Sequence, residues 1–315
     1  MLTWKKKGLI FSPDANYPWM HSHAQCPYPL LLDNIIRVYF STREAYHNGL
    51  SRAYGGYVDL DRNDLTKVID ISVLPLTPLG RLGEFDEFGS MPGSVIRINH
   101  NYLLYYCGWS RSTSTPYNWA IGVAESVDAK QFTRCGNGPI LGPTINEPYL
   151  QACPIVYEFD HGKFEMYYLS GVKWISAGEK LESQYLLMRA TSDDGFIWRR
   201  DGIPLLPISV EHESQTSAAI FEYGGKYHML FSFRYGLDFR TTPSRGYRIG
   251  YAWSQDRIIW HRDDSKSGLT CSDQGWDSLM VSYPHILRID GKLIMFYCGN
   301  DFGKAGFGIA EADIE

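Results

Sequence analysis

The sequence PIVYEFDHGKFEMYY, residues 154–168, contains the pattern that decides the fold. A proline precedes one apolar stretch, Asp160-His161-Gly162 is a tight-turn signal, and a second apolar stretch closes on the aromatic doublet Tyr167-Tyr168. Proline suits the first residue of a strand, where no ladder donor is needed, and a short turn between two alternating stretches is typical of a hairpin. The segment therefore predicts two antiparallel strands joined by a tight turn.

The same arrangement recurs along the whole chain. The aromatic doublets lie 62 to 66 residues apart, at Tyr39-Phe40, Tyr105-Tyr106, Tyr167-Tyr168, Phe231-Ser232-Phe233 and Phe296-Tyr297. Thirteen or fourteen residues before them stand Pro27, Pro92, Pro154, Ala218 and Pro284. Each doublet is followed by a third apolar stretch, and in three units a fourth carries Phe132, Trp198 or Trp260. Four strands repeated five times are typical of propeller blades.

The two chain ends supply an independent match. Residues 4–8 repeat the Trp-to-Gly spacing of residues 198–202, which close the third unit, whereas the fifth unit stops after its third strand near residues 309–311. The amino-terminal segment, residues 2–10, can therefore supply the missing fourth strand. The sequence predicts an all-β, five-bladed β-propeller with four antiparallel strands per blade. It forms a single domain over residues 1–315, and its ring is closed by the N-terminal strand.

Composition excludes several partners. The chain has 30 basic and 35 acidic residues, a net charge of −5, and no basic block beyond Lys5-Lys6-Lys7, so a nucleic-acid partner is disfavoured. No apolar run approaches the length of a membrane span or of a signal peptide, so we expect a cytoplasmic protein without a membrane partner. The six cysteines form no CxxC pair, which predicts free thiols.

These motifs resemble the five-bladed propeller glycosidase superfamily, which contains the arabinanase and xylosidase, invertase and mannoside-phosphorylase families. The resemblance covers nearly the whole chain. It rests on the recurring prolines and on the following motifs: Gly162-Lys163-Phe164, Gly225-Lys226-Tyr227, residues 192–198, and Gly275-Trp276-Asp277 ahead of Tyr283-Pro284. It implies a pocket at one end of the central channel with a carboxylate acid and a carboxylate base or nucleophile.

The chain departs from that superfamily at one position. Several of its families have an Asp directly before the proline of the first blade, where this chain has Cys26. The equivalent residues of the later blades are Met91, Cys153, Ser217 and Tyr283. The usual base is absent from its usual place.

Acidic residues recur five to seven positions before the aligned proline or Ala218, which places them at the expected pocket end. They are Asp86, Glu87, Glu147, Glu213 and Asp277. Convergence at the axis would raise some of their pKa values, as a general acid requires. The catalytic candidates are Glu147 and Glu213 foremost, then Asp86 and Asp277. Replacing Glu147 or Glu213 by Gln would then abolish most activity at little cost in stability. The alternative is that these acids are solvated or pair with nearby arginines.

Other residues of the same end are candidates for substrate binding. They are His23, Arg43, Glu87, Trp109, Arg234, Tyr283 and Asn300. Tryptophans can stack on a sugar ring, and arginines can grip a carboxylate or phosphate. Histidines 23, 212 and 285 have no short spacing motif, so no metal and no cofactor is predicted.

The predicted function is therefore a carbohydrate-processing enzyme, a hydrolase or a glycosyl-transferring relative, that acts with two carboxylates in the central pocket. Its partner is a small-molecule carbohydrate, anionic or phosphorylated if the arginines bind it. The alternative is a propeller that binds a sugar or another small polar ligand without catalysis, or that serves as a protein scaffold. The absent Asp before Pro27 favours this alternative.

Overall fold

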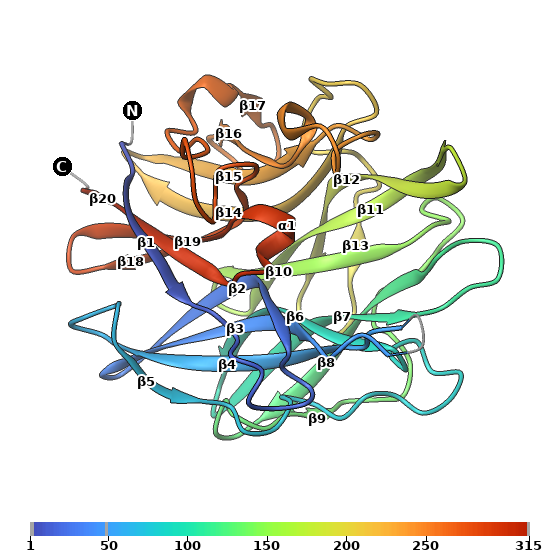
Figure 1. The fold of residues 1–315 in the computed structure, drawn as a ribbon, viewed down its shortest axis with the longest axis horizontal. Coiled ribbons are helices and arrows are strands. Elements are labelled where there is room, and N and C mark those ends of the chain that lie inside the picture. The colour runs from blue at the N-terminus through green and yellow to red at the C-terminus, as the bar shows by residue number, and fades with distance from the viewer. Residues whose placement is uncertain (1–2, 48–49, 314–315) are drawn as a thin grey trace.

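The computed structural model describes residues 3–47 and 50–313, and its strands form three sheets of four strands and one sheet of eight, in which the parallel pairing of Ala53 with Gly89 joins two groups of four (Figure 1). The five groups of four strands are called units one to five below. The first unit contains β2 (Ser22–Leu32), β3 (Ile35–Arg43), β4 (Ala53–Asp61) and β5 (Val68–Ile71). The second contains β6 (Gly89–Ile98), β7 (Asn101–Ser110), β8 (Asn118–Ser126) and β9 (Thr133–Arg134). The third contains β10 (Gln151–Asp160), β11 (Lys163–Ala177), β12 (Lys180–Ser192) and β13 (Arg199–Arg200). The fourth contains β14 (Ser214–Tyr223), β15 (Lys226–Arg234), β16 (Arg248–Ser254) and β17 (His261–Arg262). The fifth contains β18 (Ser282–Ile289), β19 (Lys292–Cys298), β20 (Phe307–Asp313) and β1 (Lys5–Phe11).

Helical structure is minor. It comprises α1 (Asn300–Gly303) and 3₁₀ turns at Pro243–Arg245 and Asp264–Lys266. None of the helices in the described part of the chain has the length and apolar character that a membrane crossing requires. The prediction of an all-β fold is confirmed.

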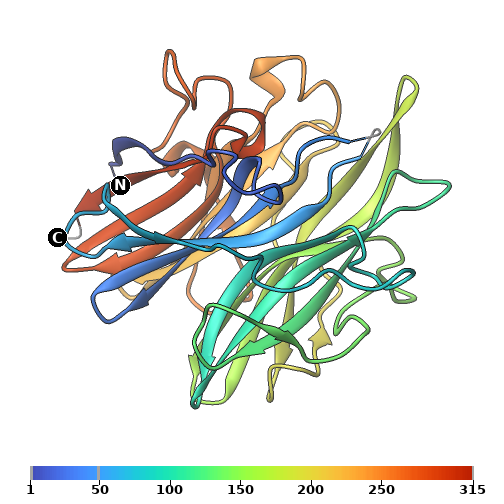
Figure 2. The same ribbon diagram turned by 60° about the horizontal axis from the view of Figure 1, so that its bottom comes forward.

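The two chain ends meet in one sheet. Strand β1 pairs antiparallel with β20, from Lys5 opposite Glu311 to Phe11 opposite Phe307. Figures 1 and 2 show the N- and C-terminal labels close together at the edge of the same sheet. The predicted pairing of the chain ends is therefore present for Lys5–Phe11, while residue 2 of the predicted segment lies outside the described residues.

Apolar side chains on the faces of the sheets join each unit to the next. One buried cluster contains Tyr39 of unit one and Val95 of unit two, a second contains Tyr105 of unit two and Met166 of unit three, and a third contains Tyr167 of unit three and Phe231 of unit four. Leu230 and Tyr297 belong to one cluster between units four and five, and Phe40 and Phe296 to one between units one and five. The aromatic doublets thus supply much of the packing between sheets.

The sequence predicted that the recurring prolines are the first residues of their strands, but the structure places them inside the strands. Strand β10 begins at Gln151, and its register with β11 shifts between Ala152 and Ile155, so Pro154 lies in a β-bulge. A bulge tolerates proline because the ladder is interrupted there. The residue before the proline has a positive φ, 50° at Cys153 and 55° at Cys26. The bulge therefore turns these side chains out of the regular alternation of the strand.

Candidate functional site

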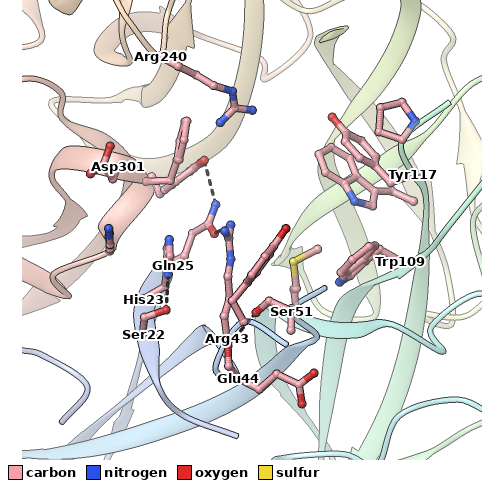
Figure 3. A pocket seen from close by; sticks show the side chains of 18 of the residues that line it. Ser22, His23, Gln25, Arg43, Glu44, Ser51, Trp109, Tyr117, Arg240 and Asp301 are labelled. Atoms are coloured by element: carbon pink, nitrogen blue, oxygen red, sulfur yellow. Dashed lines mark hydrogen bonds between the residues drawn. The ribbon is translucent and has the colours of Figure 1, made fainter. Parts of the chain in front are cut away.

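A cavity of about 990 Å³, the outer cavity, lies where the first strand of a unit begins and where the loops after the second strands cluster. Figure 3 shows Trp109 and Tyr117 on one side of it and His23 and Asp301 on the other. Arg43 and Arg240 point into the space between them. Side chains from several units thus border this cavity.

A smaller space of about 110 Å³, the inner chamber, lies next to the outer cavity. The two spaces adjoin, because they share lining residues that include Gln25, Arg43, Trp119, Tyr185 and Tyr283. The residues before the aligned prolines or Ala218 all line the inner chamber: Cys26, Met91, Cys153, Ser217 and Tyr283. The bulges therefore direct one side chain from each unit toward this chamber. Cys26, which stands at the position where the resemblance implied an Asp in the first blade, is part of its wall.

All six cysteines are unpaired in the structure. Burial raises the pKa of the Cys107 thiol well above its usual range, so this thiol stays protonated at neutral pH. Cys298 is also buried, and its Sγ donates to the carbonyl oxygen of Ala24 at 3.3 Å. We expect intact-mass measurements with and without reductant to agree. A difference of about two daltons would show a disulfide and contradict this arrangement.

The four predicted catalytic acids do not line either space. They are almost fully buried, with exposed fractions of 0% for Asp86 and Glu213 and 3% for Glu147 and Asp277. Each instead meets a basic residue on the outermost strand of its own unit. Glu147 contacts Arg200 of the third unit, and Glu213 contacts Arg262 of the fourth.

The contacts follow one plan in three units. Tyr106, the second member of its doublet, donates to Asp86 at 2.9 Å, and Arg134 lies 3.1 Å from the same carboxylate. Tyr297 donates to Asp277 at 3.0 Å, and Lys6 of β1 pairs with it at 2.7 Å. In the third unit Tyr168 and Arg200 contact Glu147 at 3.0 Å and 3.7 Å. Burial raises the pKa of Asp86, and the hydrogen bond from Tyr106 opposes this shift.

The fourth unit modifies the plan, because Ser232 stands where the doublets of units two, three and five have Tyr. Glu213 pairs with Arg262 at 2.6 Å and accepts hydrogen bonds from the backbone N–H groups of Ser209 and Val210. Gln215 donates a hydrogen bond at 2.7 Å to the same Glu213 carboxylate oxygen that Arg262 contacts. These contacts fix the loop that precedes β14. Each of the four buried acids thus links the segment before the first strand of its unit to the outermost strand of that unit.

Five of the predicted binding residues do line the outer cavity: His23, Arg43, Trp109, Arg234 and Tyr283. Two do not. Glu87 accepts the backbone N–H of Gly83 at 2.7 Å, and Asn300 accepts that of Leu279 at 2.7 Å. Both side chains therefore brace loops beside the cavity.

His23 is held neutral. Burial, followed by the charges of Arg43 and Lys304, lowers its pKa to about 3. Its Nδ1 lies 2.9 Å from the hydroxyl oxygen of Ser22. His23 can therefore exchange hydrogen bonds with a ligand at neutral pH without adding charge. The described residues contain no group of three or more His, Cys, Asp or Glu that could hold a metal ion.

Aromatic side chains form one wall of the outer cavity. Tyr117 and Trp119 stack with ring centres 4.5 Å apart and an angle of 19° between their planes. Trp119 also packs near Tyr185, whose hydroxyl hydrogen bonds to that of Tyr247. Sequence reasoning missed Tyr117, Tyr185 and Tyr247. Tyr117 and Tyr247 directly precede β8 and β16, which is a signal in the sequence, whereas Tyr185 lies within β12.

The charges of the outer cavity are mostly positive. The cations that line it are Arg43, Arg111, Arg234, Arg240 and Lys304. Among the described residues, the acids that line it are Glu44 and Asp301. Glu44 is engaged by the backbone N–H of Arg52 at 3.1 Å and by the hydroxyl of Tyr54 at 3.2 Å. The protein as a whole carries a net charge of −5, so the positive cavity is a local feature.

Comparison with solved structures shows that this fold recurs in glycoside hydrolases. One described as a glycoside hydrolase has a TM-score of 0.75 and 20% identity, with 97% of this chain and 90% of that chain covered. A glycosyl hydrolase from Bacteroides ovatus has a TM-score of 0.72 and 16% identity over 99% and 94%. A structure from the GH130 family, described as containing hydrolases that target β-1,2 mannosidic linkages, has a TM-score of 0.66 and 15% identity over 99% and 93%. The predicted resemblance to propeller glycosidases is thus confirmed as a likeness of fold.

Comparison of sequences identifies relatives over nearly the whole chain. No family model matches it. Two uncharacterized proteins of Mycobacterium tuberculosis, MT1551 of strain CDC 1551 / Oshkosh and Rv1502 of strain H37Rv, are each 30% identical over 311 residues, which are 98% of this chain and 99% of theirs. The chain belongs to the same protein family as these two mycobacterial proteins.

Proposed function

We propose that the chain is a single five-bladed β-propeller that binds an acidic or phosphorylated carbohydrate in its outer cavity and acts on it. The observation that carries this proposal is the pairing of a stacked aromatic wall with an excess of cations in one cavity. Aromatic faces bind the apolar face of a sugar ring, and arginines bind carboxylate or phosphate oxygens.

The propeller itself is supported by the packing. Buried clusters join unit one to two, two to three, three to four, four to five, and five to one. Strand β1 completes the fifth unit. Sheets that pack in this cyclic order place the outer cavity at one end of a central channel, where propellers bind ligands.

The proposed reaction class is glycoside hydrolysis or glycosyl transfer, by analogy with structures of the same fold. Such a reaction uses two carboxylates, and the described acids on the cavity wall are Glu44 and Asp301. Asp301 is exposed and lies in the short turn α1 with a φ of 52°. We assign the acid and base roles to these two residues in place of Glu147 and Glu213.

A second candidate is a propeller that binds the carbohydrate without reaction. One observation favours it: Asp86, Glu147, Glu213 and Asp277 are all engaged outside the cavity. The six free cysteines suit a reducing compartment such as the cytoplasm for either function.

A panel of neutral, acidic and phosphorylated saccharides tests the binding step. We expect one class to raise the melting temperature of the wild-type protein, because a ligand that binds only the folded state stabilises it. Trp119→Ala should weaken that ligand about 3- to 10-fold by removing the stacking surface. Trp253→Ala is the control, since Trp253 stacks on His261 and does not line the cavity. A panel in which no saccharide shifts the melting temperature would overturn the proposal.

Product analysis then separates the two candidates. If the chain is an enzyme, Glu44→Gln and Asp301→Asn should reduce turnover of the bound saccharide by at least about 100-fold, as loss of an acid or base does. Glu87→Gln is the matched control, because Glu87 lies outside the cavity lining. Binding without any turnover would select the non-catalytic function.

A further inference from the structure

Buried arginines in this protein are normally paired with carboxylates. Arg37 pairs with Asp59 at 2.6 Å, and Arg262 pairs with Glu213 at 2.6 Å and with Asp264 at 2.8 Å. Taking a guanidinium out of water is costly unless an opposite charge or a full set of hydrogen bonds replaces the water. The fold therefore supplies an acid wherever it buries these arginines.

Arg234 breaks this rule. It is 3% exposed and lines the outer cavity, yet it has no ion pair among the described residues. Its hydrogen-bond acceptors are neutral oxygens: the carbonyls of Tyr235 and Ser183 and the hydroxyl of Tyr185. Its buried Nε has no hydrogen-bond partner. The side chain is thus a buried positive charge with an unused donor.

The setting of Arg234 holds its guanidinium in place without neutralising it. The guanidinium carbon lies 3.6 Å from the centre of the Phe239 ring, and Tyr185 and Tyr247 flank it at 5.3 Å and 5.6 Å. Aromatic faces attract a cation but carry no counter-charge. An anion that enters the cavity would meet an arginine whose orientation is already fixed.

Two further arginines border the same space. Arg43 donates to the side-chain oxygen of Gln25 at 3.3 Å and has no acid partner among the described residues. Burial and the nearby charge of Arg240 lower the pKa of Arg43, so these two guanidiniums repel each other. Arg240 has one partner, Glu182, at 3.1 Å. An anion between them would remove the repulsion.

We propose that Arg43, Arg234 and Arg240 form an oxyanion site that binds a carboxylate or phosphate group, with Arg234 as its anchor. The guanidinium fork matches both groups through paired N–H donors, which an ammonium cannot do. If the ligand is the carbohydrate of the proposed function, on which this placement of the sugar rests, its ring lies on the wall formed by Tyr117 and Trp119. The binding of an oxyanion by the three arginines does not depend on the sugar.

The first experiment uses inorganic phosphate alone. At constant ionic strength set with chloride, phosphate should raise the melting temperature of the wild-type protein. Arg234→Gln and Arg43→Gln should each weaken phosphate about 10- to 100-fold, as loss of a charge-assisted contact does. Arg245→Gln is the control, because Arg245 pairs with Glu211 and Asp238 and does not line the cavity. If Arg234→Gln fails to fold, Arg43→Gln and Arg240→Gln still carry the test.

The second experiment compares a hexose with its uronic acid and its 6-phosphate, for each common hexose. The charged members should bind about 10- to 100-fold tighter than the neutral parent, and Arg234→Lys should recover only part of what Arg234→Gln loses. The preferred charged member identifies the group as carboxylate or phosphate.

The outcomes separate this site from the proposed function. Equal binding of neutral and charged sugars, with no effect of phosphate, would overturn the oxyanion site and leave a carbohydrate-binding cavity. Binding of phosphate that depends on Arg234, with no saccharide bound, would support the oxyanion site and overturn the carbohydrate function. If nothing binds, both fail.

Discussion

Replacing Glu213 with Gln should lower the free energy of unfolding by about 3–5 kcal/mol, because it leaves Arg262 as a buried charge without this partner. The carboxylate of Glu213 is fully buried, contacts Arg262 at 2.6 Å, and accepts the backbone N–H groups of Ser209 and Val210. An amide can accept one of these contacts but offers its NH₂ group to the guanidinium. The sequence alone predicted the opposite result, a loss of activity at little cost in stability.

Urea unfolding of the Glu213→Gln variant checks this expectation through its midpoint. Glu211→Gln is the control, because the Glu211 side chain is 61% exposed and its ion pair with Arg245 is loose at 3.6 Å. Adding Arg262→Met to Glu213→Gln measures the coupling of the pair, because Arg262 keeps its contact with Asp264 at 2.8 Å in the single variant and loses it in the double variant. A variant of unchanged midpoint that loses turnover of a true substrate would instead return Glu213 to a catalytic role.

The fold could be predicted because its signals repeat. The doublets, turns and prolines each occur in nearly every unit, and a repeated signal survives an error at any single position. The prediction that proline begins each strand was wrong. The position of the proline depends on a β-bulge, and the pattern of apolar residues does not show where the register of a strand shifts. The pairing of β1 with β20 followed from the match between Trp4 and Trp198.

The same repetition explains why the recurring acidic residues were expected in the pocket, although they do not line it. Asp86, Glu147 and Asp277 recur at equivalent positions because the tyrosine of each doublet and a base on each outer strand recur with them. A residue that repeats in several units indicates a structural contact common to all units. The partners were visible in the sequence as Arg134, Arg200, Arg262 and Lys6, one on each outermost strand.

The residues that line the cavity differ in type from unit to unit. Arg43, Trp109 and Arg234 lie at or near the ends of β3, β7 and β15, each opposite the start of the first strand of its unit. Their convergence depends on loops of different length, whose conformation no short pattern specifies. Sequence reasoning identified these three residues because they lie at the end of a unit where a pocket was expected. It did not identify Phe239 and Lys304, which lie in loops and also line the cavity.

Deletion of residues 2–10 should lower the melting temperature by at least about 10 °C or prevent folding, because several buried contacts are lost together. Trp4 is 7% exposed, packs in the cluster of Leu293 and Tyr297, and donates from Nε1 to the carbonyl of Ser267 at 3.1 Å. Removing a buried tryptophan typically costs about 3–5 kcal/mol. Loss of Lys6 also leaves the buried Asp277 without its ion-pair partner, and loss of β1 exposes the edge of β20.

Single replacements separate these contributions. Trp4→Ala and Lys6→Met should each lower the melting temperature by about 6–20 °C, since a loss of about 3–5 kcal/mol corresponds to about 2–4 °C for each kcal/mol in a large domain. Lys5→Ala is the matched control, because Lys5 is exposed on the same strand and its substitution should fall within about 0.5 kcal/mol of the wild type. A deletion variant that melts with the wild type would show that β20 tolerates an open edge. The fifth unit would then be stable with three strands, and the N-terminal strand would not be needed to complete it.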